Sequence, residues 1–129
     1  MHLKSVFLVC LGLIGSALAA GAVAAPEKPA QWQEGEAIYA EHCADCHRRT
    51  GQGLPKAIPA LAANEFVTGD PQGVIQILLD GRQGSLGRMP AWGRLLTDQQ
   101  LAAVATYIRR AWGNQAEAVT PEQVAKQRR

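Results

Sequence analysis

Two cysteines and a histidine within five residues constrain this chain more than any other feature. They are Cys43, Cys46 and His47, in the order Cys-x-x-Cys-His. Two thiols at this spacing lie on one turn, from which each can add to one vinyl group along an edge of a porphyrin. The imidazole that follows is carried under the ring, where it can bind iron as the proximal ligand. The motif therefore predicts one haem, attached through two thioethers.

Two other chemistries also use a Cys-x-x-Cys pair. A dithiol redox pair would need a strand–helix–strand context, and no strand pattern surrounds Cys43. Half of a zinc site would need further cysteine or histidine ligands. The remaining ones are Cys10, inside an apolar N-terminal run, and His2 and His42. His42 directly precedes Cys43 and is poorly placed to complete a tetrahedron, so haem is favoured and the other two chemistries stay open.

The N-terminus has the pattern of a secretory signal peptide. Lys4 provides a positive charge, residues 5–18 are apolar or small, and small residues continue to Ala25. Ala22-Val23-Ala24 offers a cleavage site, and Ala17-Leu18-Ala19 offers an earlier one. The same run is about long enough to remain as an uncleaved membrane anchor. Because c-type haem is attached outside the bacterial cytoplasm, export agrees with the cysteine motif, and a periplasmic location is expected.

The chain divides into four segments. Residues 1–24 form the signal peptide or, alternatively, an uncleaved anchor, and residues 25–30 form a linker. Residues 31–113 form a single haem domain, and residues 114–129 form a C-terminal tail. Removal of 24 of the 129 residues leaves 105, which suits one small domain. The mature chain would then hold a single methionine, Met89.

Met89 is the candidate for the second iron ligand. Pro90 biases it toward an extended conformation, and a thioether on an ordered loop can reach the distal side of the iron. Ligation by histidine and methionine raises the reduction potential. The alternative is an ordinary methionine that fills a gap in the core. His42 is the rival ligand, but one residue before Cys43 it cannot easily reach the opposite face of the ring.

Three longer helices are predicted from capping residues and apolar spacing. The first runs from Gln31 to His42, the second begins at Asp70-Pro71 and stops at Gly81, and the third begins at the capping box of Thr97 and can end at Gly113. A glycine inside the first helix costs helix propensity and indicates that another helix crosses closely, unless that helix is loosely packed.

The other segments add no strand pattern. Residues 48–64 are rich in glycine and proline and predict a loop. Thr120-Pro121-Glu122-Gln123 is a second capping box, which starts a short helix or lies in a frayed tail. The predicted fold class is therefore all-α.

Charge is unevenly divided along the chain. Residues 25–80 carry four Lys/Arg and eight Asp/Glu, a net −4, whereas residues 81–129 carry eight and three, a net +5. The sum of +1 does not favour a nucleic-acid-binding protein. Arg82, Arg88 and Arg94 flank Met89, where they are either ordinary solvated side chains or help to present the haem edge to an acidic partner.

The order of the motifs is more specific than any one of them. Cys43 to His47 is followed by Gly51 and Gly53, by Pro59-Ala60-Leu61, by Met89-Pro90-Ala91-Trp92 and by an amphipathic terminal helix. Over roughly Trp32 to Gly113, the chain resembles a class I cytochrome c of the bacterial periplasmic kind. Residues 107–114 are similar to the ends of cytochrome domains that serve membrane-associated periplasmic dehydrogenases.

The resemblance implies a fold of three to five helices around one covalently attached haem c, with iron bound by His47 and Met89. It implies that the Pro59 carbonyl accepts the ring N–H of His47 and so fixes its tautomer. Trp92 is expected to pack near the haem. The resemblance also implies that the first and last helices cross at a glycine, here Gly35, and an aromatic residue.

The predicted function is the transfer of single electrons between a dehydrogenase donor and a cytochrome or oxidase acceptor. An iron with both axial positions filled by protein leaves none for a substrate, so no catalytic residue is assigned. The sequence has no second haem motif and no Gly-rich nucleotide loop. Two alternatives stay open: a haem subunit of a larger dehydrogenase or oxidase complex, and a haem enzyme or gas sensor with a labile Met89. Membrane contact is expected only through partners or an uncleaved N-terminus.

Overall fold

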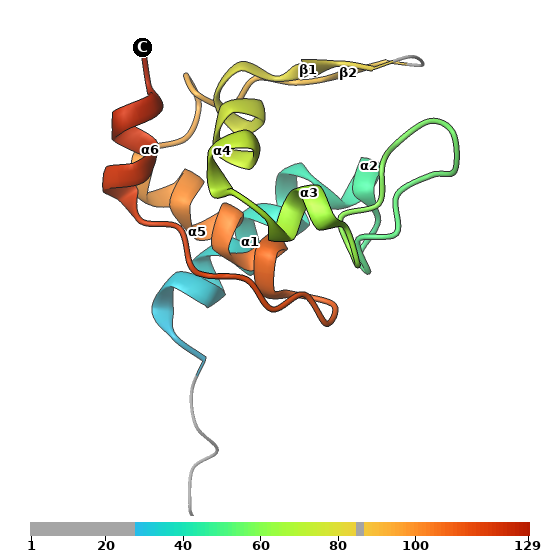
Figure 1. Cartoon of the computed structure of the whole chain (residues 1–129), viewed down its shortest axis with the longest axis horizontal. Helices are drawn as coiled ribbons and strands as arrows, with labels where there is room; N and C mark the ends of the chain where they lie inside the picture. Colours follow the sequence, from blue (N-terminus) through green and yellow to red (C-terminus); the bar gives the residue numbers. More distant parts are fainter. Residues whose placement is uncertain (1–27, 85–86) are drawn as a thin grey trace, which may run out of the picture.

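The computed structural model describes residues 28–84 and 87–129. The predicted signal peptide, its alternative as an anchor and Cys10 fall outside the described residues. The elements in chain order are α1 (Ala30–His42), α2 (Ala44–His47), α3 (Glu65–Thr68), α4 (Pro71–Asp80), β1 (Arg82–Gln83), β2 (Arg88–Met89), α5 (Asp98–Arg110) and α6 (Pro121–Gln127) (Figure 1). No helix within these two ranges has the length and apolar content needed to cross a membrane.

The fold is all-α, as the sequence predicts. The strands found in residues 28–84 and 87–129 are two residues long each and pair antiparallel, with Arg82 opposite Met89. Two helices, α2 and α3, are single turns of four residues. The sequence pattern did not indicate the hairpin or α3, because such short segments have no periodicity to detect.

The capping residues determine where α4 begins and ends. The side chain of Asp70 accepts a hydrogen bond from the N–H of Gln72 at 2.9 Å, and Pro71 occupies the first turn. Gly81 follows the last residue with a φ of 73°, a left-handed conformation that favours glycine. This helix places four apolar side chains in the core: Val74, Ile75, Leu78 and Leu79.

The predicted capping box at the start of α5 is also present. The Thr97 side chain accepts from the N–H of Gln100, and the Gln100 side chain accepts from the N–H of Thr97. The helix ends at Arg110 rather than continuing to Gly113, because Trp112 already has left-handed backbone with a φ of 54°.

The first and last helices of the domain cross in direct contact, at the centre of the view in Figure 1. Gly35 lies at the crossing, where an added methyl group would be 2.2 Å from the carbonyl oxygen of Ala103 and 2.9 Å from Cβ of Tyr107. Tyr39, one turn later in α1, has its ring centroid 5.4 Å from that of Tyr107. The glycine in α1 therefore has the close-packing role that the sequence predicts.

Gly35→Ala is expected to destabilise the protein although alanine favours a helix. The helix gains about 1 kcal/mol of propensity, but the methyl group would overlap backbone atoms of α5, and overpacking of this kind costs about 1–3 kcal/mol or more. Guanidinium unfolding of the holoprotein should show a net loss of stability. Gly87→Ala is the control, because a methyl group there meets nothing within 4 Å. A stabilised Gly35→Ala variant would contradict the close crossing.

Arg109, in the last turn of α5, is a buried charged residue. Arg109 is only 2% exposed to solvent. Its Nη1 donates to the carbonyl oxygens of Val67 and Gly69, both at 2.8 Å. Nε donates to the carbonyl oxygen of Glu117 at 3.2 Å. Burial lowers the pKa of the guanidinium, and the nearby carboxylates of Asp70 and Glu117 oppose that shift. Arg109 thus connects the end of α5 to α3 and to the residue that follows α3.

The C-terminal tail forms a helix that packs on the domain. Thr120 caps α6 in the predicted capping box with Gln123. Val119 and Val124 are fully buried, and α6 contacts both α5 and α4. Of the two alternatives for this segment, the short helix is the one in the structure.

Candidate functional site

The Cys-x-x-Cys-His motif lies on a single backbone turn at the junction of α1 and α2. The N–H of Cys43 donates to the carbonyl oxygen of Tyr39, and the N–H of His47 donates to that of Cys43, both at 2.9 Å. Cys43 is half-buried, Cys46 is exposed, and neither forms a disulfide. His47 is 7% exposed. Two free thiols and a buried imidazole are therefore held together within one turn.

The hydrogen bonding of His47 fixes which ring nitrogen can bind a metal. Nδ1 lies 3.1 Å from the carbonyl oxygen of Pro59. A carbonyl can only accept, so Nδ1 donates and the lone pair remains on Nε2. Burial lowers the pKa of His47, and the hydrogen bond to Pro59 opposes that shift. The imidazole is consequently neutral at neutral pH, which is the form that binds iron.

A glycine allows Pro59 to approach the histidine. The N–H of Gly53 donates to the carbonyl oxygen of His47 at 3.0 Å, and Gly53 has a φ of 63°. A Cβ atom at this position would be 2.3 Å from the carbonyl oxygen of Ile58 and 2.6 Å from that of Pro59. Any side chain at residue 53 would therefore push the Pro59 carbonyl away from its place beside the imidazole.

Three side chains for which the sequence predicted no role at the site form hydrogen bonds with the loop of residues 48–64. The hydroxyl of Tyr39 donates to the carbonyl oxygen of Arg48 at 2.6 Å, and the ring N–H of Trp112 donates to that of Arg49 at 3.0 Å. The side-chain amide of Asn114 donates to the carbonyl oxygen of Leu61 at 2.9 Å and accepts from the N–H of Ala63 at 3.0 Å. A single asparagine after a helix has no spacing that marks it, so only the folded chain reveals this role.

The thiols do not resemble a redox dithiol pair. Burial raises the pKa of the Cys43 thiol to about 12, and repulsion from Cys46 adds to the shift. A reactive dithiol needs the opposite, a lowered thiol pKa. In residues 28–84 and 87–129, no three His, Cys, Asp or Glu side chains come together as a metal-binding group. That part of the chain therefore offers no ligand set for the zinc alternative.

Met89 is held in extended conformation on the β1–β2 hairpin. It pairs with Arg82, and its carbonyl oxygen would be 2.6 Å from a Cβ atom at Gly81, so the backbone passes close over that glycine. The side chain is half-buried and packs against the core. In Figure 1 the hairpin extends toward the side of the molecule that carries α2 and the loop of residues 48–64. The structure thus places a thioether on an ordered segment, as Pro90 led us to expect.

Trp92 and His42 lie against each other. Their ring centroids are 4.9 Å apart, and the N–H of Trp92 donates to the carbonyl oxygen of Leu78 at 2.9 Å. His42 is half-buried in the last turn of α1, with Nε2 3.8 Å from Glu41. The contact connects the end of α1 to the segment that follows Met89.

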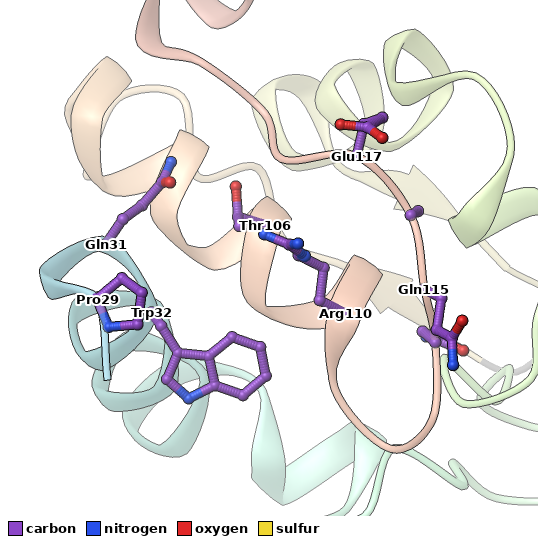
Figure 2. A pocket seen from close by; sticks show the side chains of 9 residues that line it. Pro29, Gln31, Trp32, Thr106, Arg110, Gln115 and Glu117 are labelled. Atoms are coloured by element: carbon purple, nitrogen blue, oxygen red, sulfur yellow. The ribbon is translucent and has the colours of Figure 1, made fainter. Parts of the chain in front are cut away.

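A cavity in the described part of the chain lies away from the motif turn. It has a volume of about 550 Å³ and is bounded by the start of α1, the end of α5 and the segment before α6. Figure 2 shows Trp32, Arg110 and Glu117 among the side chains around it. None of the predicted site residues lines it.

The residues of the motif turn fit a covalently attached haem. The turn presents two uncrosslinked thiols at the required spacing, and the Pro59 carbonyl selects the tautomer whose Nε2 can bind iron. The family model described as "Cytochrome C oxidase, cbb3-type, subunit III" matches residues 30–108. The chain belongs to this family of c-type cytochromes. Its cofactor is covalently bound haem c, with iron.

Known relatives of this cytochrome include one that the match covers almost completely and others of which it covers a quarter or less. It is 32% identical over 126 residues to cytochrome c-552 of Thermus thermophilus, covering 74% of this chain and 95% of that protein. It is 39% identical over 107 residues to the gluconate 2-dehydrogenase cytochrome c subunit of Pantoea cypripedii, covering 75% of this chain and 24% of the relative. The cytochrome thus spans about a quarter of the length of that dehydrogenase subunit.

A solved structure shows the same fold. The c-type cytochrome XoxG from Methylobacterium extorquens AM1 superposes with a TM-score of 0.51 at 23% identity, covering 75% of this chain and 65% of the other. The all-α prediction and the class I cytochrome c resemblance are confirmed by these comparisons.

Proposed function

We propose that this cytochrome carries single electrons between redox partners outside the cytoplasm, with haem attached at Cys43 and Cys46 and iron bound by His47 and Met89. The proposal depends above all on the hydrogen bond from His47 Nδ1 to Pro59, because it leaves Nε2 of a neutral imidazole as the ligand atom. When bound, the haem iron supplies a one-electron Fe(II)/Fe(III) couple.

The surrounding residues support a carrier because their hydrogen bonds hold the segments that carry Pro59 and Met89. Tyr39, Trp112 and Asn114 fasten the loop that contains Pro59, and the β1–β2 pairing holds Met89. A ligand set that is held by its supporting hydrogen bonds keeps its geometry in both oxidation states. With both axial positions filled by side chains, the cytochrome would have no catalysis of its own.

The relatives favour a second form of the same function, as an electron-transfer subunit of a larger oxidoreductase. Two relatives are the gluconate 2-dehydrogenase cytochrome c subunit of Pantoea cypripedii and the alcohol dehydrogenase (quinone) cytochrome c subunit of Gluconacetobacter polyoxogenes. A dehydrogenase is therefore the proposed donor, and a cytochrome or an oxidase the proposed acceptor.

Spectroscopy and mass spectrometry of the exported protein test the proposal. We expect the mass of one haem added to the chain, a weak long-wavelength sulfur-to-iron charge-transfer band in the oxidised state, and slow, weak binding of carbon monoxide after reduction. A high-spin protein that binds carbon monoxide avidly would instead support the haem enzyme or gas sensor. A colourless protein with two free thiols would overturn the haem site altogether.

The arginines around Met89 give the proposed function a measurable electrostatic signature. Arg82, Arg88 and Arg94 are all exposed. Exposed charges of one sign steer an oppositely charged partner and raise its association rate. Replacing all three with glutamine is expected to lower the rate of oxidation by ferricyanide, an anionic one-electron oxidant, roughly tenfold at low ionic strength.

The matched control removes the same charge from another part of the surface. Arg110, Lys126 and Arg129 are exposed at the end of α5 and in the C-terminal segment. Their triple glutamine variant should change the rate and its salt dependence much less. Equal effects in the two triple variants would show that net charge, rather than a docking surface around Met89, governs the encounter.

A further inference from the structure

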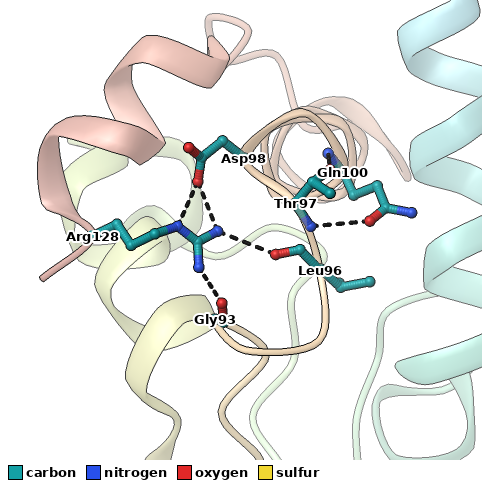
Figure 3. Close-up of polar contacts among 6 residues, drawn as sticks. All are labelled: Gly93, Leu96, Thr97, Asp98, Gln100 and Arg128. Carbon is teal, nitrogen blue, oxygen red and sulfur yellow. Dashed lines mark hydrogen bonds and ion pairs between the residues drawn. The ribbon is translucent and has the colours of Figure 1, made fainter.

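Arg128, in the segment after α6, makes the densest set of polar contacts around the segment that follows Met89 (Figure 3). Nη1 donates to the carbonyl oxygen of Gly93, and Nη2 donates to that of Leu96 at 3.1 Å. Nε and Nη2 both lie 2.7 Å from Oδ1 of Asp98. Among the described residues, neither carbonyl accepts a backbone N–H. Arg128 therefore donates to two carbonyls of the turn at residues 92–96 that no backbone N–H of the described residues reaches.

The opposite side of the same turn is held by α4. The N–H of Trp92 donates to the carbonyl oxygen of Leu78 at 2.9 Å, and the N–H of Gly93 donates to that of Leu79 at 3.1 Å. A Cβ atom at Gly93 would be 2.7 Å from the Leu79 oxygen, so the turn lies directly against the end of α4. The turn is thus fixed between α4 and Arg128.

This turn follows Met89 by only a few residues. The Met89 end of the intervening segment is fixed by its pairing with Arg82 and by its close passage over Gly81. The Gly93 end is fixed by α4 and Arg128. A short segment held at both ends cannot move its thioether far without breaking one of these contacts.

We propose that Arg128 is a positioning residue for Met89, and that the C-terminal helix α6 thereby controls how easily the distal iron ligand is displaced. The inference rests on the proposed function, because it assumes that Met89 binds the iron. The family match ends at residue 108, so the contact comes from a part of the chain beyond the matched domain. Removing the guanidinium frees the turn on one side and raises the fraction of molecules in which Met89 is detached.

The test is the affinity of the oxidised holoprotein for added imidazole, a ligand that competes with Met89. Its apparent dissociation constant is inversely proportional to the fraction of molecules with an open distal position. Arg128→Gln is expected to tighten imidazole binding roughly twofold to thirtyfold, the range of coupling effects from residues outside a site. The charge-transfer band should be lost in parallel during the titration.

Two further variants distinguish the loss of the Arg128 hydrogen bonds from the loss of its charge. Arg129→Gln removes the same charge one residue later, and Arg129 makes no side-chain hydrogen bond or ion pair within residues 28–84 and 87–129, so its imidazole affinity should match the parent. Arg128→Lys keeps the charge near Asp98 but lacks the planar fork that reaches two carbonyls and a carboxylate together. It should give an intermediate affinity. If Arg128→Gln does not accumulate, Asp98→Asn removes the ion pair alone and should also tighten imidazole binding.

The possible failures are distinguishable. A purely global loss of stability would lower the unfolding midpoint of Arg128→Gln and leave the imidazole affinity of the folded protein unchanged. That result, or an equal effect of Arg129→Gln, would overturn the positioning role and leave the electron carrier standing. A parent protein without the charge-transfer band would overturn Met89 ligation itself.

Discussion

His47→Ala is expected to yield an exported polypeptide without stably attached haem. The substitution removes the buried, neutral imidazole whose Nε2 is the proposed iron ligand beside both thiols. It also leaves the Pro59 carbonyl without the donor that His47 provides. Mass spectrometry should find the chain without the added mass of haem, and the visible spectrum should lack the absorption of a c-type cytochrome.

His42→Ala is the matched control for this experiment. His42 lies only one residue before Cys43 and its ring contacts that of Trp92, but within residues 28–84 and 87–129 it makes no hydrogen bond that would select a ligand tautomer. This variant should retain its covalent haem. If His47→Ala accumulated with covalent haem and the parent spectrum, His47 would not be the proximal ligand.

Met89→Ala is expected to keep the covalent haem but to lower the reduction potential. A methionine ligand favours the reduced iron, so its loss should shift the potential down by roughly 0.1–0.3 V. The open distal position should also bind carbon monoxide rapidly after reduction. Potentiometric titration and carbon monoxide binding measure the two effects on one sample.

The variant Met89→His distinguishes the effect of losing the sulfur ligand from the effect of opening the distal iron position. Met89→His restores a strong ligand on the same hairpin, so it should share the lowered potential but bind carbon monoxide poorly. The ligand assignment fails if Met89→Ala keeps the parent potential and its charge-transfer band.

Local features of this protein could be predicted because their causes are local. Thr97 and Thr120 begin helices since their hydroxyls accept from N–H groups three residues away. Gly35 was recognisable because a glycine is costly inside a helix unless something lies close to it. Met89 was placed on an extended segment because Pro90 restricts the residue before it.

The supporting contacts could not be predicted, because each joins residues far apart in the sequence. Arg109 has a position that favours a helix dipole, yet its guanidinium is buried on the carbonyls of Val67 and Gly69. Asn114 and Arg128 likewise satisfy loop carbonyls in distant segments. Such pairings depend on which backbone groups the fold leaves without partners, and no spacing in the sequence records that.

The crossing of α1 and α5 also sets an order of events during synthesis. Chains are made from the N-terminus at about 5–20 residues per second, and residues 43–97 separate the two helices. The motif turn therefore emerges together with α1, seconds before the partner of α1 exists. During that interval the face of α1 around Gly35 has nothing to pack against, so the helix crossing cannot form. The crossing therefore forms only after the motif turn, the loop that carries Pro59 and the hairpin that carries Met89 have all been made.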